Sequence, residues 1–408
     1  MIKQLILFDK KEIPKKEKRI FFIIILGGFI ARILFLVLFI DLSNVNYYEY
    51  GTIAENILSG NGYFYPFLEN YDGAPYPSAY MPPGYVLLLL PFFLIDEIFL
   101  RNAVFLIFQG LLSCIAIYLS FSLTKRFYGF STAIIAAIIS AFLPEFLFAS
   151  SSLTPTIIYH ILILTIFNLL YSLNNNFNKL TLVYLGISFS VLIYFRPEIS
   201  LFALMYIIYL LIKKQFKATI LFISVIVIFV LPWTIRNYMV FSRVIPFTTN
   251  AGLNFYRGNN ADAIGNWNDS VIISRLDEVK YQKDFEIRMN EIYFNRTFEM
   301  IEKNPTIILK NIMLKTFSLW IFNPSEKQVL SPFYLLPWFV ILISAGYGIY
   351  KNPSWNQFKF IYLFLIFTQL VTMFFLVLPR YQTMMKISLI PFAAFGFISL
   401  YNLIKKDQ

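Results

Sequence analysis

The chain has 408 residues, of which 58% are hydrophobic, 19% aromatic and only 14% charged. Because soluble domains carry about 25% charged residues, this composition excludes an ordinary soluble protein and predicts an integral membrane protein. The formal net charge is +11. Lys and Arg gather at the ends of apolar runs, however, where they fix topology, so we expect no nucleic-acid partner.

Cysteine and histidine each occur once. The single cysteine, Cys114, excludes an intrachain disulfide and a multi-Cys metal site, and the single histidine, His160, excludes a His-rich metal cluster. Both residues lie in apolar runs. We therefore expect His160 to pack or hydrogen-bond between helices rather than to bind a ligand.

The chain begins with a basic tail and a first membrane span. Residues 1–19 include the run KKEIPKKEKR, which predicts a segment that stays in the cytoplasm. The apolar run 20–40 is long enough for the roughly 30 Å hydrocarbon core and lacks a small-residue cleavage site, so we expect it to remain as a span. Arg32 interrupts this run. A charge at that depth costs at least about 2.5 kcal/mol unless it is paired or hydrated, so Arg32 should face protein or reach the interface.

The next stretch is expected outside the membrane. It contains no Lys or Arg between Asp41 and Arg101, although its polar residues include Glu49 and Asp72. Loops held in the cytoplasm collect basic residues, so the loop 42–101 is predicted to be exported.

Two helices are predicted within this exported loop. The run PPGYVLLLLPFFLI opens with a double proline, is broken by Pro91 and is too short to span well, so we expect it to be interfacial or re-entrant. The run YYEYGTIAENILSG has the spacing of a helix that lies on the membrane surface and ends at Gly60. The residues on its apolar face are Tyr50, Ile53, Ala54, Ile57 and Leu58.

The remaining apolar runs predict about ten spans in total, with both chain ends in the cytoplasm. A long polar segment, 237–328, is predicted to be a second exported subdomain, and its part 304–322 places Lys310 and Lys315 among apolar residues, as in a surface-lying helix. This divides the chain into a tail (1–19), an N-terminal membrane module (20–236), the exported subdomain and C-terminal helices (329–408). The spans are expected at 20–40, 102–123, 131–148, 157–173, 180–195, 199–212, 219–235, 333–350, 358–378 and 383–404.

Polar residues at the predicted outer face indicate the chemistry. Arginines can hold a phosphate through a planar fork, and carboxylates beside them could accept a proton from a hydroxyl or bind a divalent cation. This pattern suits a lipid-linked phosphosugar better than a soluble substrate, although the arginines could also cap helices or pair with lipid head groups. The residues are Asn46, Glu49, Asp72, Arg196, Glu198, Arg236, Arg257, Asn259, Asn260, Asp262 and Arg380.

The loop Thr248–Trp267 is rich in Gly, Asn and aromatic residues. Such a composition offers backbone N–H groups in tight turns and flat rings for sugars, and an ordinary surface turn would show it too.

Several motifs, taken in order along the chain, resemble the GT-C membrane glycosyltransferases, which include protein O-mannosyltransferases and the lipid A aminoarabinose transferase. The likeness covers most of the chain and is closest to the bacterial branch described as dolichyl-phosphate-mannose-type transferases. The residues that carry it are Tyr50, Ala54, Leu58, Gly60, Gly62 and Tyr63; Pro82 to Tyr85; Arg196-Pro197; Arg236-Asn237-Tyr238; the loop from Thr248 to Asn260; and Arg380-Tyr381 with Pro391 downstream.

The resemblance implies an all-α polytopic GT-C fold, a polyprenyl-phosphate-sugar donor, an outward-facing site, an inverting transfer and often a divalent cation (Mg, Mn or Zn). Two family acids are missing. The first-loop aspartate is replaced by Asn46, and Thr156 follows Thr154-Pro155, where the family carries an acid. Asparagine cannot act as a general base at neutral pH, so Glu49 or Asp72 has taken over, the register slips locally, or catalysis is impaired.

The resulting hypothesis is a transfer of one sugar to a hydroxyl of a glycolipid, glycan or protein at the outer face of the inner (plasma) membrane. Glu49 would be the base, and Asn46 or Asp72 would position the acceptor or a cation. The donor phosphate would be held by Arg196, Arg236, Arg380 and Tyr381, and other substrate contacts would come from Tyr50, Tyr85, Arg257, Asn259 and Asn260. The alternatives are a lipid-linked sugar flippase or transporter and a non-catalytic GT-C-like binding protein.

Overall fold

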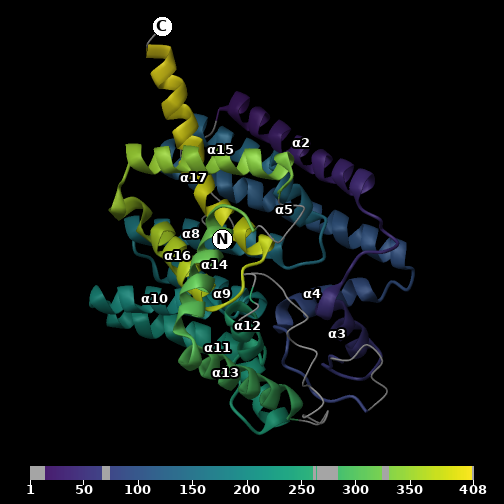
Figure 1. Cartoon of the computed structure of the whole chain (residues 1–408). Coiled ribbons are helices and arrows are strands. Elements are labelled where there is room, and N and C mark those ends of the chain that lie inside the picture. The colour runs from purple at the N-terminus through teal and green to yellow at the C-terminus, as the bar shows by residue number, and fades with distance from the viewer. Residues whose placement is uncertain (1–13, 67–73, 261–262, 264–283, 324–329, 407–408) are drawn as a thin grey trace.

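The structure is a computed structural model and describes residues 14–66, 74–260, 263, 284–323 and 330–406. Within these ranges every regular element is a helix and none is a strand (Figure 1), as the sequence predicted.

Seven helices of the described chain are long and apolar enough to cross a membrane. A bent pair, α6 (Phe130–Phe142) and α7 (Pro144–Ser150), makes an eighth span if its two parts, 55° apart, are counted together. The bend falls at Pro144, which lacks the N–H that would continue the α6 ladder. The seven helices are α2 (Lys15–Phe39), α5 (Ile98–Tyr128), α8 (Thr156–Asn175), α11 (Phe216–Phe241), α15 (Pro332–Lys351), α16 (Trp355–Phe374) and α17 (Pro379–Lys406).

Nine of the ten predicted spans fall on one helix each, and the span 131–148 falls on the bent pair α6 and α7. Two of the nine helices are short. α9 (Lys179–Phe195) has 17 residues and α10 (Ile199–Ile212) has 14. At 1.5 Å per residue, α10 is only about 21 Å long, less than the hydrocarbon core. The two are joined by the turn at Arg196-Pro197.

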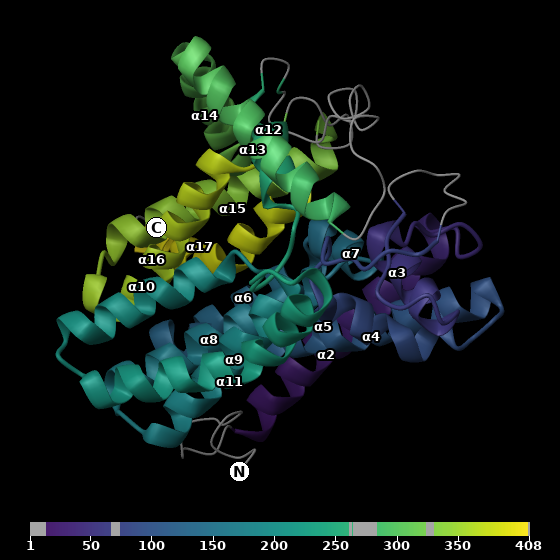
Figure 2. The same ribbon diagram turned by 90° about the horizontal axis from the view of Figure 1, so that it is seen from below.

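The helices pack in two layers around one large apolar core. The C-terminal helices α15–α17 lie on one side of α8, α9 and α11 (Figure 2). Phe189 of α9, Phe202 of α10 and Phe364 of α16 are buried together between the layers. Arg32 is buried in α2, and its guanidinium donates to the carbonyls of Gly28, Ser140 and Ala141. The expectation that Arg32 faces protein is therefore confirmed.

The loop 42–101 contains the two predicted helices, α3 (Tyr48–Leu58) and α4 (Pro83–Phe93), which pack against each other. Ile53 and Ala54 of the predicted α3 face are fully buried, whereas Leu58 at its end is exposed. The chain leaves α3 through Gly60, whose φ of +83° suits glycine. In the P-P-G-Y run, a side chain at Gly84 would lie 2.7 Å from the Tyr194 carbonyl oxygen, so α4 packs directly on the end of α9.

The segment 237–328 supplies α12 (Ala251–Asn259), α13 (Phe285–Lys303) and α14 (Pro305–Trp320). Leu253 and Phe285 pack with Tyr76 and Tyr80 of the loop 42–101, so the two segments share a core. α14 was predicted to lie on the surface with both lysines among apolar residues. Lys310 is exposed, but Lys315 is fully buried where α14 packs on α16 and α12.

Candidate active site

A cavity of about 370 Å³ lies where α3, the Arg196 turn, α12 and the connection between α16 and α17 meet. It brings together five of the predicted site residues, although they come from opposite ends of the chain. They are Glu49, Tyr50, Arg196, Arg380 and Tyr381.

Helix α3 presents Glu49 and Tyr50 to the cavity from its first turn. The Tyr50 ring is buried edge-on against Tyr85, 5.1 Å between centroids, and the Tyr85 hydroxyl donates to Gln109 Oε1. Burial raises the pKa of Tyr50 to about 12, although Arg380 and Arg196 act in the opposite direction. Tyr50 therefore keeps its phenol proton and can donate a hydrogen bond into the cavity.

Arg196 follows the last residue of α9 and is held on three sides. It forms an ion pair with Glu198 at 3.3 Å, lies 4.3 Å from the centroid of the Tyr381 ring, and directs Nη2 to the Met384 sulfur. Its Nε is buried without a hydrogen-bond partner among the described residues. The guanidinium is thus fixed in place with one N–H still unused.

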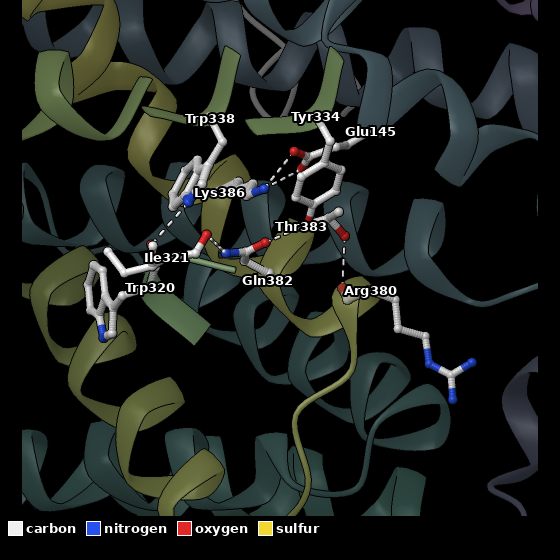
Figure 3. Close-up of polar contacts among 9 residues, drawn as sticks. All are labelled: Glu145, Trp320, Ile321, Tyr334, Trp338, Arg380, Gln382, Thr383 and Lys386. Carbon is white, nitrogen blue, oxygen red and sulfur yellow. Dashed lines mark hydrogen bonds and ion pairs between the residues drawn. The ribbon is translucent and has the colours of Figure 1, made fainter. Parts of the chain in front are cut away.

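Arg380 and Tyr381 lie in the first turn of α17. The Arg380 side chain points away from the polar cluster formed by the later residues of the helix (Figure 3). Its guanidinium lies 5.9 Å from the ring centroids of both Tyr48 and Tyr381. No carboxylate pairs with it among the described residues, so its charge is available to an anion in the cavity.

Other predicted site residues do not line this cavity. Arg236 donates to the Ser78 carbonyl at 2.6 Å and lies over Trp233, on the outer side of the segment that carries Tyr80. Asn46 is exposed, and its Oδ1 accepts from the backbone N–H of Tyr48. Tyr85 supports Tyr50 from behind. Asp72, like Asp262, lies outside the described residues.

The α12 residues predicted to contact sugar also lie away from the cavity. Asn259 donates to the carbonyls of Phe374 and Phe255 and accepts from Lys315 Nζ, while Asn260 donates to the Tyr256 carbonyl. Arg257 is buried and hydrogen-bonds Tyr80. The reason is close packing: a side chain at Gly258 would lie 2.8 Å from the Phe375 carbonyl carbon, which brings the neighbouring amides onto the backbone.

Several residues that line the cavity were not assigned a catalytic or substrate-binding role from the sequence, although Glu198 was placed at the outer face and the loop from Thr248 to Asn260 was singled out. Asn250 and Asn254 are one helical turn apart, earlier in the same loop as Asn259. This i, i+4 spacing of two amides was the available signal. The others are Tyr80, Tyr159 and Glu198.

The described residues do not form a zinc site made of protein ligands alone. They contain no group of three His, Cys, Asp or Glu side chains close enough to share an ion. A protein zinc site needs at least three such ligands. The cavity offers two carboxylates, Glu49 and Glu198, and Glu198 is paired with Arg196.

Comparison with known proteins bears on the fold. No family model and no curated protein sequence matches the chain. Solved structures of an oligosaccharyltransferase from Archaeoglobus fulgidus do match. The AglB complex with an inhibitory peptide and a dolichol-phosphate is 16% identical, with a TM-score of 0.54, over 97% of this chain and 52% of that one. The chain has a GT-C fold.

Two further structures of the A. fulgidus oligosaccharyltransferase agree. One, tethered to an acceptor peptide, is 13% identical with a TM-score of 0.56, over 95% of this chain and 50% of that one. The other, a complex with Zn and sulfate, is 14% identical with a TM-score of 0.53, over 94% and 49%. This chain therefore spans about half the length of the structures it matches. The GT-C fold predicted from the motifs is confirmed.

Proposed function

We propose that the chain is a membrane glycosyltransferase that moves one sugar from a polyprenyl-phosphate donor to a hydroxyl of a glycolipid, glycan or protein. One observation carries the proposal. A single cavity combines the carboxylate of Glu49 with the guanidiniums of Arg196 and Arg380, and its wall continues into apolar residues of α10 and α16. An amphiphilic phosphosugar requires such a combination of charge and apolar surface.

Arg196, Arg380 and Tyr381 would hold the donor phosphate. The phosphate is the leaving group, and negative charge grows on it as its bond to the sugar breaks. Two guanidiniums neutralise this charge, and the unused Nε–H of Arg196 supplies a donor that is already oriented. Tyr50, which keeps its proton, donates from the α3 side.

The lipid tail would lie along the apolar end of the cavity. Leu201 of α10 and Phe367 and Val371 of α16 line that end, and the Leu201 side chain is about half exposed (49%). The AglB complex contains a dolichol-phosphate, which is a polyprenyl-type lipid phosphate.

Glu49 would be the general base, because it is the cavity carboxylate that is free of an arginine partner among the described residues. The acceptor oxygen attacks the anomeric carbon and its proton passes to Glu49, while the bond from that carbon to the phosphate oxygen breaks and its electrons leave with the phosphate. Attack opposite the leaving group inverts the anomeric centre. The proposed transfer uses no metal ion.

Arg236, Arg257, Asn259 and Asn260 would then act indirectly. They hold the segment with Tyr80 and the connection between α16 and α17, both of which form walls of the cavity. The distribution of basic residues along the chain supports a site at the outer face of the plasma membrane.

The test is transfer by the purified full-length chain from polyprenyl-phosphate sugars, with mass spectrometry of surface glycans and lipids in cells that lack it. Glu49→Gln and Arg380→Ala should abolish transfer and reproduce the altered glycan profile. Donor binding without turnover would favour a non-catalytic binding protein, and flux into vesicles without a covalent product would favour a transporter. If wild-type protein neither transfers sugar nor alters any glycan, the proposal is wrong.

A further inference from the structure

A buried ion pair joins α7 to α17 inside the helix bundle. Lys386 Nζ lies 2.6 Å from both carboxylate oxygens of Glu145. The exposed fraction of the side chain is 0% for Lys386 and 3% for Glu145. The ammonium also lies 4.3 Å from the ring centroids of Tyr334 and Trp338 of α15. Ionisable groups at such depth are costly, and those that proteins retain there usually serve a function.

Lys386 lies on the same helix as Arg380 and Tyr381, two of the residues proposed to hold the donor phosphate. Lys386 is six residues after Arg380, a distance of about 9 Å along the helix axis. On α17, Tyr381 and Met384 face the cavity, three residues apart. Gln382 and Lys386, four residues apart, face away from it, toward α15 and α7. One side of the helix therefore forms the cavity wall and the other side is anchored.

A second set of contacts completes the anchor (Figure 3). Gln382 donates to the Ile321 carbonyl at 3.0 Å and accepts from the Tyr334 hydroxyl. The Trp338 indole donates to the Trp320 carbonyl, also at 3.0 Å. Polar contacts thus connect the first turns of α17 to α15, to the end of α14 and, through Glu145, to α7.

Glu145 belongs to α7, and the chain that follows α7 lines the cavity. It lies in the first turn of α7, directly after the break at Pro144. The chain continues from α7 to Pro155 and Tyr159, both of which line the cavity. The ion pair therefore joins the two walls that enter the site from distant parts of the sequence.

We infer that Glu145 and Lys386 are positioning residues that fix the rotation and depth of α17, so that Arg380 and Tyr381 face the donor phosphate. Apolar side chains tolerate sliding, whereas a paired charge in an apolar interior has one favourable partner and so selects one register. A slip of one residue would rotate α17 by about 100° and turn Arg380 out of the cavity. This inference rests on the proposed function for the identity of the phosphate ligand.

The experiment compares binding with turnover in full-length protein in lipid nanodiscs. The probe is sugar-free polyprenyl phosphate, whose affinity is measured directly, beside the donor and acceptor KM values. Lys386→Met and Glu145→Gln should weaken probe binding and raise the donor KM, with a loss in kcat/KM of about 10²-fold, as for a misplaced binding group. The acceptor KM should change little. The exchange E145K/K386E should recover part of the loss.

The matched control is Arg32→Met. Arg32 is also a buried cation in a helix long and apolar enough to cross the membrane. It donates to backbone carbonyls of α2 and α6, and it does not line the cavity. This variant should lower the Tm while leaving probe affinity unchanged. If Lys386→Met fails to fold, Lys386→Arg and Glu145→Asp take its place. These variants keep the charges but change the length of the side chains, and they should still weaken binding of the probe.

A labelling experiment tests the position of α17 directly. With Cys114→Ser, a cysteine introduced by Tyr381→Cys should react with a water-soluble maleimide at a different rate once Lys386→Met is added. If the pair variants only lower the Tm, as Arg32→Met does, and change neither probe affinity nor labelling rate, the positioning role is refuted. If wild-type protein binds the probe but transfers no sugar, the proposed enzyme fails, while the probe affinities still decide the role of the pair.

Discussion

Two buried lysines lie on either side of the connection between α16 and α17, and their surroundings differ. Lys386, beyond the connection, has a carboxylate partner and two aromatic rings. Lys315 contacts the chain just before the connection. It donates to two neutral groups, the Met373 carbonyl at 2.7 Å and Asn259 Oδ1 at 2.9 Å. Both side chains are fully buried.

The difference reflects where each lysine lies. Lys386 is inside a membrane-spanning helix, where a charge without a counter-charge would be very costly. Lys315 belongs to α14, which is not among the helices long and apolar enough to cross a membrane, and burial there lowers its pKa to about 7. Lysine can give up its proton in such a site, so dipoles suffice as partners. The contacts of Lys386 thus depend on a fixed pair of charges, whereas the contacts of Lys315 depend on a group that titrates near neutral pH.

The largest effect is expected for Arg380, in the first turn of α17. Arg380→Ala should lower kcat by about 10²–10³-fold, because it removes charge stabilisation of the leaving phosphate. Steady-state transfer assays measure the loss. The control is Arg243→Ala, an exposed arginine paired with Glu291 outside the cavity, which should keep full activity. Equal losses in both variants would contradict a specific role for Arg380.

A double-mutant cycle tests whether the Lys386 anchor acts through Arg380. If Lys386 only positions Arg380 and its neighbour, adding Lys386→Met to Arg380→Ala should lower kcat/KM by clearly less than Lys386→Met does alone. Fully additive losses in kcat/KM would show that the ion pair affects the reaction by another route.

Lys315→Met should have a smaller effect, and one that depends on pH. In the unfolded chain this lysine binds its proton up to its ordinary pKa of 10.5, whereas in the folded chain the pKa is lowered to about 7. Between these values the unfolded state binds more protons, so the Lys315 contribution to the free energy of unfolding increases with pH. Lys315→Met should remove this increase from thermal unfolding curves recorded between about pH 7 and 10. The same slope in the variant would show that Lys315 does not titrate in this range.

Removal of divalent cations is expected to have the smallest effect. The described part of the cavity offers Glu49 as its one carboxylate without an arginine partner, and the phosphate charge is met by two guanidiniums. Activity should therefore survive dialysis against EDTA. A loss that Mn²⁺ restores would indicate a ligand outside the described residues, and Asp72→Asn would then identify or exclude Asp72.

Local patterns predicted much of the site. The apolar face of α3 turns Glu49 and Tyr50 inward, and the turns at Arg196-Pro197 and Arg380-Tyr381 end or begin helices at the same level of the bundle. These features depend on helical periodicity and on the exclusion of charge from apolar runs, both of which act over a few residues.

Other residues could not be assigned in this way. Asn259 and Asn260 have the composition of a sugar-binding loop, yet their amides bond to backbone carbonyls because Gly258 packs against Phe375. Lys315 has the spacing of a solvated lysine on a surface helix, but α14 packs against α16 and buries it. In both cases the decisive neighbour is distant in sequence.

The amino-acid sequence by itself determined that this protein has many apolar helices long enough to cross a membrane and where most of them run. Hydrophobic periodicity and charge exclusion are local, so they can be read directly from the residues. Tertiary structure alone decided which polar groups share the cavity and that Glu145 meets Lys386 across 241 residues. Such contacts depend on how helices pack, and only the folded bundle specifies that packing.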